Sequence, residues 1–469
     1  MDERKYYGQW WEPSGLDAKR SGVLTVAVDG RMELELIGGI DLSVRTPLPG
    51  GGVAIGIGDR DLPILHGTCE NLDITLLDCL NLHSRGGFIE APSFQRLLAQ
   101  RAIVGTHLQS RQDDAFRAMT VRLENLTSWV SLPSVVHKAG FEENVSKAEV
   151  RLVDPLVVSV NDWEFTAQPS VRGFGFKRYR ESDSVVGDAT TELRVTPPLA
   201  TTLGSLDRVV LEFTDLLTLA MGEPCGLISM VVDLLDDEVY RLGDGTEIRR
   251  PKTAMILGRR VHTADPEAPA VELRKALFTC SDIAFVDVVP AWLEIRRKAP
   301  SACNIFFGIS YSRPTYTEMR LLSLAIALET FHRDLYGDVT DLSPARFEQI
   351  RETMLAALDD EQERAWVKEK LRNQPSFRER ARALAAVPDH AARAFVVSDV
   401  EAWAARLVTA RNGLAHSAEG GLGLDIFTLS QRTSGLLALL LMARLGLSAE
   451  VQYRAAERVL RVFEARGDS

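Results

Sequence analysis

The chain has 469 residues and a mass of 51.8 kDa, which is too long for one ordinary hydrophobic core, so two or three domains are expected. Hydrophobic residues make up 45% and charged residues 25% of the sequence, which excludes a chain dominated by disorder. The net charge of -11 excludes a surface that is basic overall and binds nucleic acid without specificity. Any site for a polyanion must therefore be argued from a local cluster of residues.

The first residues, MDERKYYGQWW, lack the apolar region and cleavage site of a secretory signal peptide. The strongest apolar run, GLLALLLMARLG, is interrupted by Arg444 well before the roughly 20 residues needed to span a bilayer. We therefore expect a cytoplasmic protein with no membrane span, in which this run forms a buried helix. The five cysteines are odd in number and form no CxxC pair, which predicts reduced core thiols and no structural zinc.

Residues 1–202 have the pattern of a β-rich N-terminal domain. The stretch GVLTVAVDGRMELELIGG alternates apolar and polar residues around the turn pair Asp29-Gly30, which is typical of a hairpin with one buried face. Four aromatic residues precede it: Tyr6, Tyr7, Trp10 and Trp11. We expect them to close a sheet edge or barrel end, and stacking on nucleic-acid bases is the alternative.

Residues 203–310 predict a mixed α/β middle region that continues the N-terminal module. The segment GSLDRVVLEFTDLLTLAMG has helical periodicity, with Leu206, Val210 and Phe213 on one side. A strand pair is expected over 227–258, with its turn at Asp244-Gly245.

Residues 311–469 are predicted to be an all-α domain, because the chain has helical periodicity almost throughout after Pro314. The expected fold class is thus a multidomain α+β protein with a β-rich N-terminal region and a C-terminal helical bundle. The helices are predicted at 316–336, 344–358, 360–372, 377–386, 398–413, 424–444 and 449–465.

Arg411 lies where an apolar residue would be expected. Ser398 and Glu401 have capping-box spacing, and the stripe of Ala404 and Leu407 that follows leads to Arg411. A buried, unpaired guanidinium costs several kcal/mol. Arg411 should therefore reach a carboxylate, backbone carbonyls, a ligand anion or a partner subunit; the alternative is that it extends its charged end into water.

Glu329 has a similar position in the helix YTEMRLLSLAIALETFHRDLYG. Met319, Leu322 and Ile326 lead to it at helical spacing, so its carboxylate is expected beside a largely apolar surface. The simpler interpretation is an exposed ion pair with Arg333 one turn later.

The segment RNGLAH combines Arg411, Asn412 and His416, and it is the one match to Arg-Asn-x3-His in the chain. Histidine titrates near neutral pH, an arginine fork matches phosphate oxygens, and an asparagine amide can orient either group. RNA carries its own 2′-hydroxyl nucleophile, so such a set can cleave it without metal. Alternatively, Gly413 ends the helix and His416 lies in the loop beyond it.

The other histidines are spread along the sequence without an HxH or HExxH pattern, so we expect no metal site and no cofactor. A single RNGLAH segment also supplies only one histidine, whereas acid and base catalysis uses two proton-transfer groups. A symmetric dimer that brings two copies of the segment together would supply both.

The helical C-terminal region with its Arg-Asn-x3-His motif resembles a HEPN ribonuclease domain, and RLLSLAIALETFHR resembles the first long helix of the ApeA-like HEPN group. The segments GQWWEPSG, GVLTV and LEFTDLLTLAMGEP resemble the N-terminal region of ApeA-type anti-phage proteins. The resemblance covers most of the chain. It implies a metal-independent endoribonuclease that acts as a homodimer or higher homo-oligomer in bacterial abortive-infection defence.

By this resemblance Arg411 and His416 would be catalytic, Asn412 would support them, and Glu329 would be the acidic partner. RNA would be the substrate, and a phage-derived trigger would release the activity. Two other functions stay open: an inactive HEPN module for dimerisation or RNA binding, and a sensor or adaptor whose β-rich domain binds a protein or a glycan.

Overall fold

The computed structural model of the chain describes most residues between 3 and 460. The residues outside the description are 1–2, 16–17, 48, 50–52, 60, 87–90, 133–134, 141–144, 151–152, 179, 182, 242, 244–245, 260–261, 263, 266–267, 313–315, 338, 417–422 and 461–469. Only the backbone is described at 44–47, 53–59, 135–140, 145–150, 172–174, 176–177, 183–186, 415–416 and 423–425.

The chain divides into two compact units. The first unit comprises Met1–Leu217 with Cys225–Ala270, and the second comprises Thr218–Pro224 with Val271–Ser469. The division falls inside helix α2 (Leu203–Met221). The predicted domain limits at 202/203 and 310/311 stay predictions.

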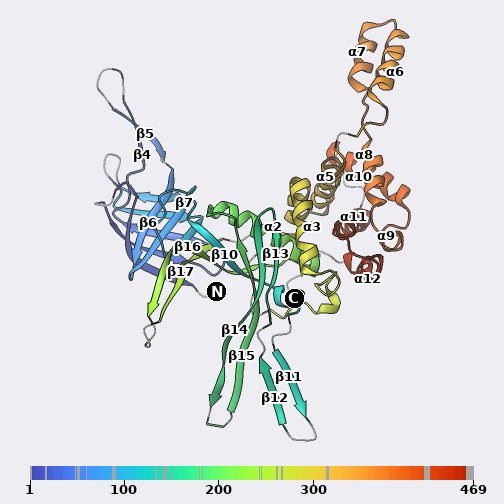
Figure 1. Cartoon of the computed structure of the whole chain (residues 1–469). Coiled ribbons are helices and arrows are strands. Elements are labelled where there is room, and N and C mark those ends of the chain that lie inside the picture. Colours follow the sequence, from blue (N-terminus) through green and yellow to red (C-terminus); the bar gives the residue numbers. More distant parts are fainter. Residues whose placement is uncertain are drawn as a thin grey trace. The chain divides into compact units, whose positions relative to one another are not determined.

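The first unit is built on strands (Figure 1). Its main sheet contains β1 (Arg4–Trp11), β2 (Arg20–Val26), β3 (Met32–Ile37), β6 (Leu62–Cys69), β7 (Leu72–Arg85), β8 (Phe94–Ala99), β9 (Arg101–Val104), β10 (Phe116–Leu123), β13 (Leu156–Val160), β14 (Trp163–Arg178), β15 (Asp183–Thr196), β16 (Leu227–Arg241) and β17 (Glu247–Gly258). Two smaller pairs are β4 (Ser43–Pro47) with β5 (Val53–Asp59) and β11 (Val135–Gly140) with β12 (Val145–Val150). Helix α1 (Leu126–Val130) follows β10.

The long strand β7 closes part of this sheet into a barrel. Its first half pairs with β6 and its second half pairs with β8, while β6, β1, β2, β3 and β8 are joined in that order. Closure of the ring removes the exposed sheet edges that would otherwise pair with other chains. The predicted hairpin is confirmed, because β2 and β3 pair antiparallel and Gly30 has a φ of 81° at the turn. The predicted pairing of β16 with β17 is also confirmed, although the turn pair Asp244-Gly245 lies outside the described residues.

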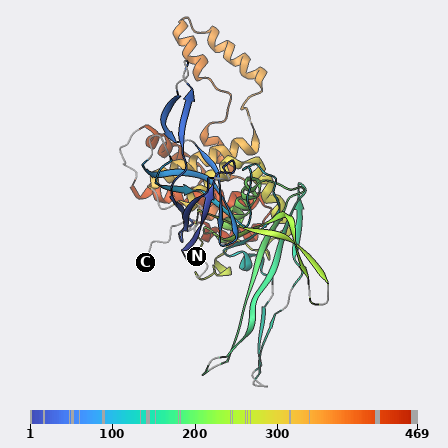
Figure 2. The same cartoon turned by 90° about the vertical axis from the view of Figure 1, so that its left-hand side faces the viewer.

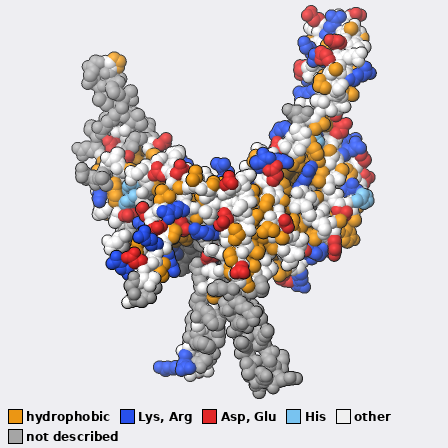
Figure 3. All heavy atoms as spheres, in the orientation of Figure 1, with side chains coloured by type: hydrophobic (Ala, Val, Ile, Leu, Met, Phe, Trp, Pro, Cys, Tyr) orange, Lys and Arg blue, Asp and Glu red, His pale blue; other side chains and the backbone are white. Residues whose placement is uncertain are grey.

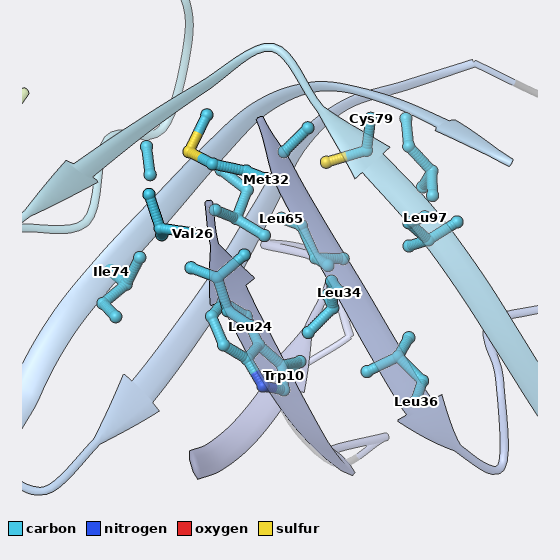
Figure 4. Close-up of a cluster of buried hydrophobic side chains, with 14 of the residues drawn as sticks. Trp10, Leu24, Val26, Met32, Leu34, Leu36, Leu65, Ile74, Cys79 and Leu97 are labelled. Carbon is cyan, nitrogen blue, oxygen red and sulfur yellow. The ribbon is translucent and has the colours of Figure 1, made fainter. Parts of the chain in front are cut away.

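Trp10 fills the centre of the barrel and is completely buried (Figure 4). Leu24, Val26, Met32 and Leu34 surround it with alternate, inward-facing side chains of β2 and β3. Trp10 therefore has a structural role and cannot stack on bases, but it belongs to barrel strand β1 and packs in the core, so the expectation that it closes a sheet edge or barrel end is wrong. Two antiparallel strand pairs, β14–β15 and β11–β12, extend from this unit (Figure 2).

Gly67 on β6 makes room for the indole of Trp10. A Cβ atom at this position would lie 2.3 Å from the Trp10 ring, which is far inside van der Waals contact. We therefore predict that Gly67→Ala lowers the free energy of unfolding by about 1–3 kcal/mol through overpacking of the barrel. Denaturant unfolding followed by tryptophan fluorescence measures this change. Gly175→Ala on β14 is the control, because nothing lies within 4 Å of a Cβ there, and equal loss in both variants would contradict the prediction.

The second unit is helical. Its helices are α3 (Phe285–Lys298), α4 (Pro300–Tyr311), α5 (Thr317–Tyr336), α6 (Pro344–Ala356), α7 (Glu361–Lys370), α8 (Phe377–Ala385), α9 (His390–Val396), α10 (Val400–His416), α11 (Gly423–Arg444) and α12 (Ala449–Val459), with a short 3-10 helix at Leu273–Lys275. All seven predicted helices are present. The sequence pattern missed α9, which is short, and it placed the start of the helical region too late, because α3 and α4 precede Pro314.

Helix α11 forms the centre of this unit. Its residues Leu436–Met442 are almost completely buried, as predicted for the longest apolar run. Within the described part of the chain, the segment Ile426–Arg444 is long and apolar enough to cross a membrane, but 72% of it is buried inside the protein. Core packing accounts for this apolar composition. None of the five cysteines forms a disulfide bond; four are buried and Cys280 is partly buried.

The predicted fold class is confirmed: a β-rich N-terminal region with a barrel and a sheet precedes a helical C-terminal region.

Candidate functional site

The RNGLAH segment forms the last turn and a half of helix α10. Asp399 caps the start of this helix, since its Oδ1 accepts a hydrogen bond from the Ala402 N–H at 2.9 Å. The predicted capping box from Ser398 to Glu401 is therefore wrong, because the N-cap residue is Asp399. Glu401 instead forms ion pairs with two arginines of α8.

The helix continues through Gly413 to His416, so Gly413 is an interior residue and not the helix-ending glycine of the alternative interpretation. With unbroken helical backbone, Asn412 and His416 are one turn apart on the same face. Asn412 is exposed. The backbone of His416 is described, whereas its side chain lies outside the described residues.

Arg411 is held by a carboxylate from a different helix. Its Nη2 lies 3.0 Å from Oε2 of Glu329 on α5, and the two side chains retain 36% and 33% of their exposure. The prediction that Arg411 must reach a partner is thus confirmed, and the partner is Glu329. The simpler pairing of Glu329 with Arg333 is not the one formed, since Arg333 approaches Asp334 at 3.6 Å.

The stripe of α5 that leads to Glu329 does not face the core, contrary to the prediction. Met319 and Ile326 on this stripe are 57% and 50% exposed. The buried face of α5 runs instead through Leu324, Leu328 and Phe331. Amphipathic helices with apolar residues on both faces cannot be oriented from their period alone, because either stripe satisfies it.

Phe377, the first residue of α8, fixes the other side of the Arg411 guanidinium. The arginine Cζ lies 4.8 Å from the centre of the phenyl ring, within the range of a cation–π contact. Arg411 is therefore held between a carboxylate from α5 and an aromatic face from α8. Sequence reasoning missed Phe377, because an aromatic residue at a helix start gives no signal for an arginine distant in sequence.

The other arginines of α8 have their own partners. Arg378 and Arg382 reach Glu401 at 3.2 and 2.6 Å, and the Nε of Arg380 donates to the carbonyl of Pro375. These contacts fasten α8 to α10 and to the chain before it. Glu401 thus shares its single negative charge between Arg378 and Arg382, whereas Arg380 meets a neutral backbone carbonyl.

His332 lies one turn after Glu329 and was also missed by the sequence patterns. It is 6% exposed, its ring lies 5.0 Å from that of Tyr336, and its Nδ1 has no hydrogen-bond partner among the described residues. Burial lowers the pKa of His332 from its ordinary value, and the nearby positive charge of Arg380 lowers it further. Burial and the charge of Arg380 therefore both favour the neutral form of His332, which lies on the same helix as Glu329.

Within the described residues, no group of three or more His, Cys, Asp or Glu side chains is arranged to hold a metal ion. The structure does bring together His66 and His107, whose rings stack at 4.4 Å in the first unit. The Nε2 atom of His66 contacts the carbonyl of Leu108, and the Nε2 atom of His107 contacts the carbonyl of Gly67. Both side chains thus connect segments of the first unit.

We predict that His332 makes the second unit less stable at acidic pH. Its pKa is lowered in the folded protein, so the unfolded chain binds a proton first as the pH falls through about 6.5, and folding stability then declines. In His332→Gln this decline should be smaller, as measured by denaturant unfolding at several values between about pH 5 and pH 8. The exposed His390→Gln is the control. An unchanged pH slope in His332→Gln would contradict the prediction.

The geometry of the second unit defines a class of protein: a helical bundle in which the arginine of an Arg-Asn-x3-His segment is fixed by a carboxylate. Residues 322–451 match the Apea-like HEPN family, whose HEPN relatives are usually ribonucleases. Residues 5–292, more than half of the chain, match ApeA N-terminal domain 1, so the chain belongs to the ApeA family. These matches confirm the resemblance seen in the sequence. The searches of curated proteins and of solved structures gave no match.

Proposed function

We propose that this protein is a metal-independent HEPN endoribonuclease of anti-phage abortive-infection defence, which cleaves RNA at a site shared across a homodimer. The observation that carries the proposal is the pairing of Arg411 with Glu329 at the start of a helical turn that also holds Asn412 and His416. Membership of the ApeA family and the HEPN match support a nuclease-type anti-phage function.

The proposed reaction needs a base, an acid and a positive charge. The neutral imidazole of His416 accepts the proton of the RNA 2′-hydroxyl, and the 2′-oxygen attacks the adjacent phosphorus. The bond to the 5′-oxygen breaks, and the protonated His416 of the second copy gives a proton to that oxygen. The products are a 2′,3′-cyclic phosphate and a 5′-hydroxyl, so no water is consumed in this step, and the two histidines supply the proton transfers that the proposal needs without a metal.

Arg411 is suited to the charge that develops on the phosphate. A guanidinium has five N–H donors, and its contact with Glu329 uses one of them, which leaves others for phosphate oxygens. Glu329 and Phe377 hold the group in place before substrate binds, which lowers the entropic cost of binding. Asn412, on the same face as His416, would orient either the histidine or the phosphate.

RNA cleavage in the presence of EDTA tests the proposal. Wild-type protein should leave 2′,3′-cyclic phosphate ends, and both Arg411→Ala and His416→Ala should slow cleavage by roughly 100-fold or more, because each removes a group that acts in the transition state. Arg406→Ala, an exposed arginine of the same helix, is the control. RNA that stays intact with wild-type protein, both alone and with lysate from phage-infected cells, would overturn the nuclease and leave the inactive HEPN module.

Glu329 gives a second and finer test. Glu329→Gln keeps the shape of the side chain but removes the charge that holds Arg411, so we expect about a tenfold loss in cleavage rate with little change in stability. The stability change should be small because both partners are about one-third exposed. Single-turnover cleavage and thermal unfolding measure the two effects. A rate equal to wild type would remove Glu329 from the site.

The first unit would then receive the phage-derived trigger and keep the nuclease inactive before infection, in the cytoplasm where RNA is present. In the competing sensor or adaptor function this unit binds a protein or glycan and the helices only assemble. Protection of cells that persists in Arg411→Ala would favour that function.

A further inference from the structure

Helices α6 and α7 form a hairpin that projects from the rest of the second unit (Figures 1 and 2). The side chain of Asn373 closes its base: Oδ1 accepts from the Leu342 N–H at 2.9 Å, and Nδ2 donates to the Leu342 carbonyl at 2.8 Å. Each helix also has a side-chain cap, from Ser343 and Asp360. These hydrogen bonds fix the base of the hairpin and the start of each of its two helices.

This hairpin has no core of its own. Neither helix contains a buried residue, although Phe347, Ile350 and Val367 are half-buried between them. Trp366 is 62% exposed and Met354 is 43% exposed. Helices of this length are marginal in water without tertiary packing, because their own hydrogen bonds do not offset the entropy of ordering them. A large exposed tryptophan on such a pair indicates a surface that a partner covers.

The charge of the hairpin disfavours RNA as that partner. Between residues 343 and 370 the chain has seven acidic and five basic side chains. On the face of the projection that Figure 3 shows, acidic and basic side chains are intermixed. A polyanion would be repelled overall, so the partner is a protein surface.

Helix α7 is self-complementary around Trp366. Glu363 lies one turn before the tryptophan and Lys370 one turn after it, so the three residues follow one face of the helix. If a second α7 packs antiparallel, its Lys370 faces the first Glu363 and the reverse pair forms at the other end. In the single chain Lys370 pairs with its exposed neighbour Glu369 at 2.8 Å, a contact that can be exchanged.

We propose that the α6–α7 hairpin is a self-association surface, in which α7 packs antiparallel on α7 of a second copy with Trp366 beside the two-fold axis. Both tryptophans become buried in this arrangement, and two Glu363–Lys370 pairs fix the direction and register of packing. The contact is separate from the site on α10 and does not rest on the nuclease function.

Sedimentation equilibrium of the full chain tests the role of the tryptophan. Trp366→Ala should weaken self-association by roughly thirtyfold or more, since an aromatic anchor at the centre of an interface is usually its main contributor. Tyr453→Ala on α12, which removes an aromatic side chain that is 57% exposed, is the matched control and should not change association. Circular dichroism checks that both variants remain folded. An unchanged association constant in folded Trp366→Ala would overturn the proposal.

A charge exchange tests the antiparallel register. Glu363→Lys alone places like charges at both ends, and Lys370→Glu alone does the same, so each should self-associate roughly tenfold more weakly. When the two variants are co-expressed, the mixed pair has opposite charges at both ends and should form in preference to either uniform pair. Affinity capture through a tag on one variant measures this preference.

The capture pattern also distinguishes this contact from a dimer formed through α10. In such a dimer residues 363 and 370 do not meet, so the tagged variant would capture both untagged variants equally. Preferential capture of Lys370→Glu by tagged Glu363→Lys supports the proposal even if no RNA is cleaved. Equal capture of both variants overturns it even if the nuclease is active.

Discussion

The helical unit depends on one constraint: the guanidinium of Arg411 lies on the inward-facing side of α10 and must be paired there. Glu329 meets this need from α5, and Phe377 covers the opposite side from α8. One charged group thus connects three helices that are distant in sequence. A partly buried charge of this kind adds little net stability, because desolvation offsets much of its attraction. Its effect is to fix the position of the Arg411 guanidinium.

The charged residues of α8 and α10 near this pair also have partners within the protein. Glu401 pairs with two arginines of α8 and so fastens α8 to α10, while Arg380 donates to the carbonyl of Pro375 and its charge acts on buried His332. These contacts fix α8 and α10 against each other and so support the position of Arg411 on α10.

The barrel and the α6–α7 hairpin differ in how they are stabilised. The barrel of the first unit closes on itself, and Trp10 packs so closely on Gly67 that a Cβ at position 67 would overlap the indole. The α6–α7 hairpin is closed only at its base by Asn373 and has no buried side chain. A closed barrel completes its core within one chain, whereas the hairpin needs a second surface to do so.

The sequence by itself determined the fold class, the β2–β3 hairpin, the seven predicted helices and the need for a partner at Arg411. These follow from local periodicity, turn residues and the cost of an unpaired charge. Only the tertiary structure decided that the partner is Glu329, that Phe377 packs on Arg411, that His332 is buried, and that Met319 and Ile326 face outward. The physical reason is that a helical period defines a stripe but not its partner. Contacts between α5, α8 and α10 depend on how separate helices pack, which no local pattern contains.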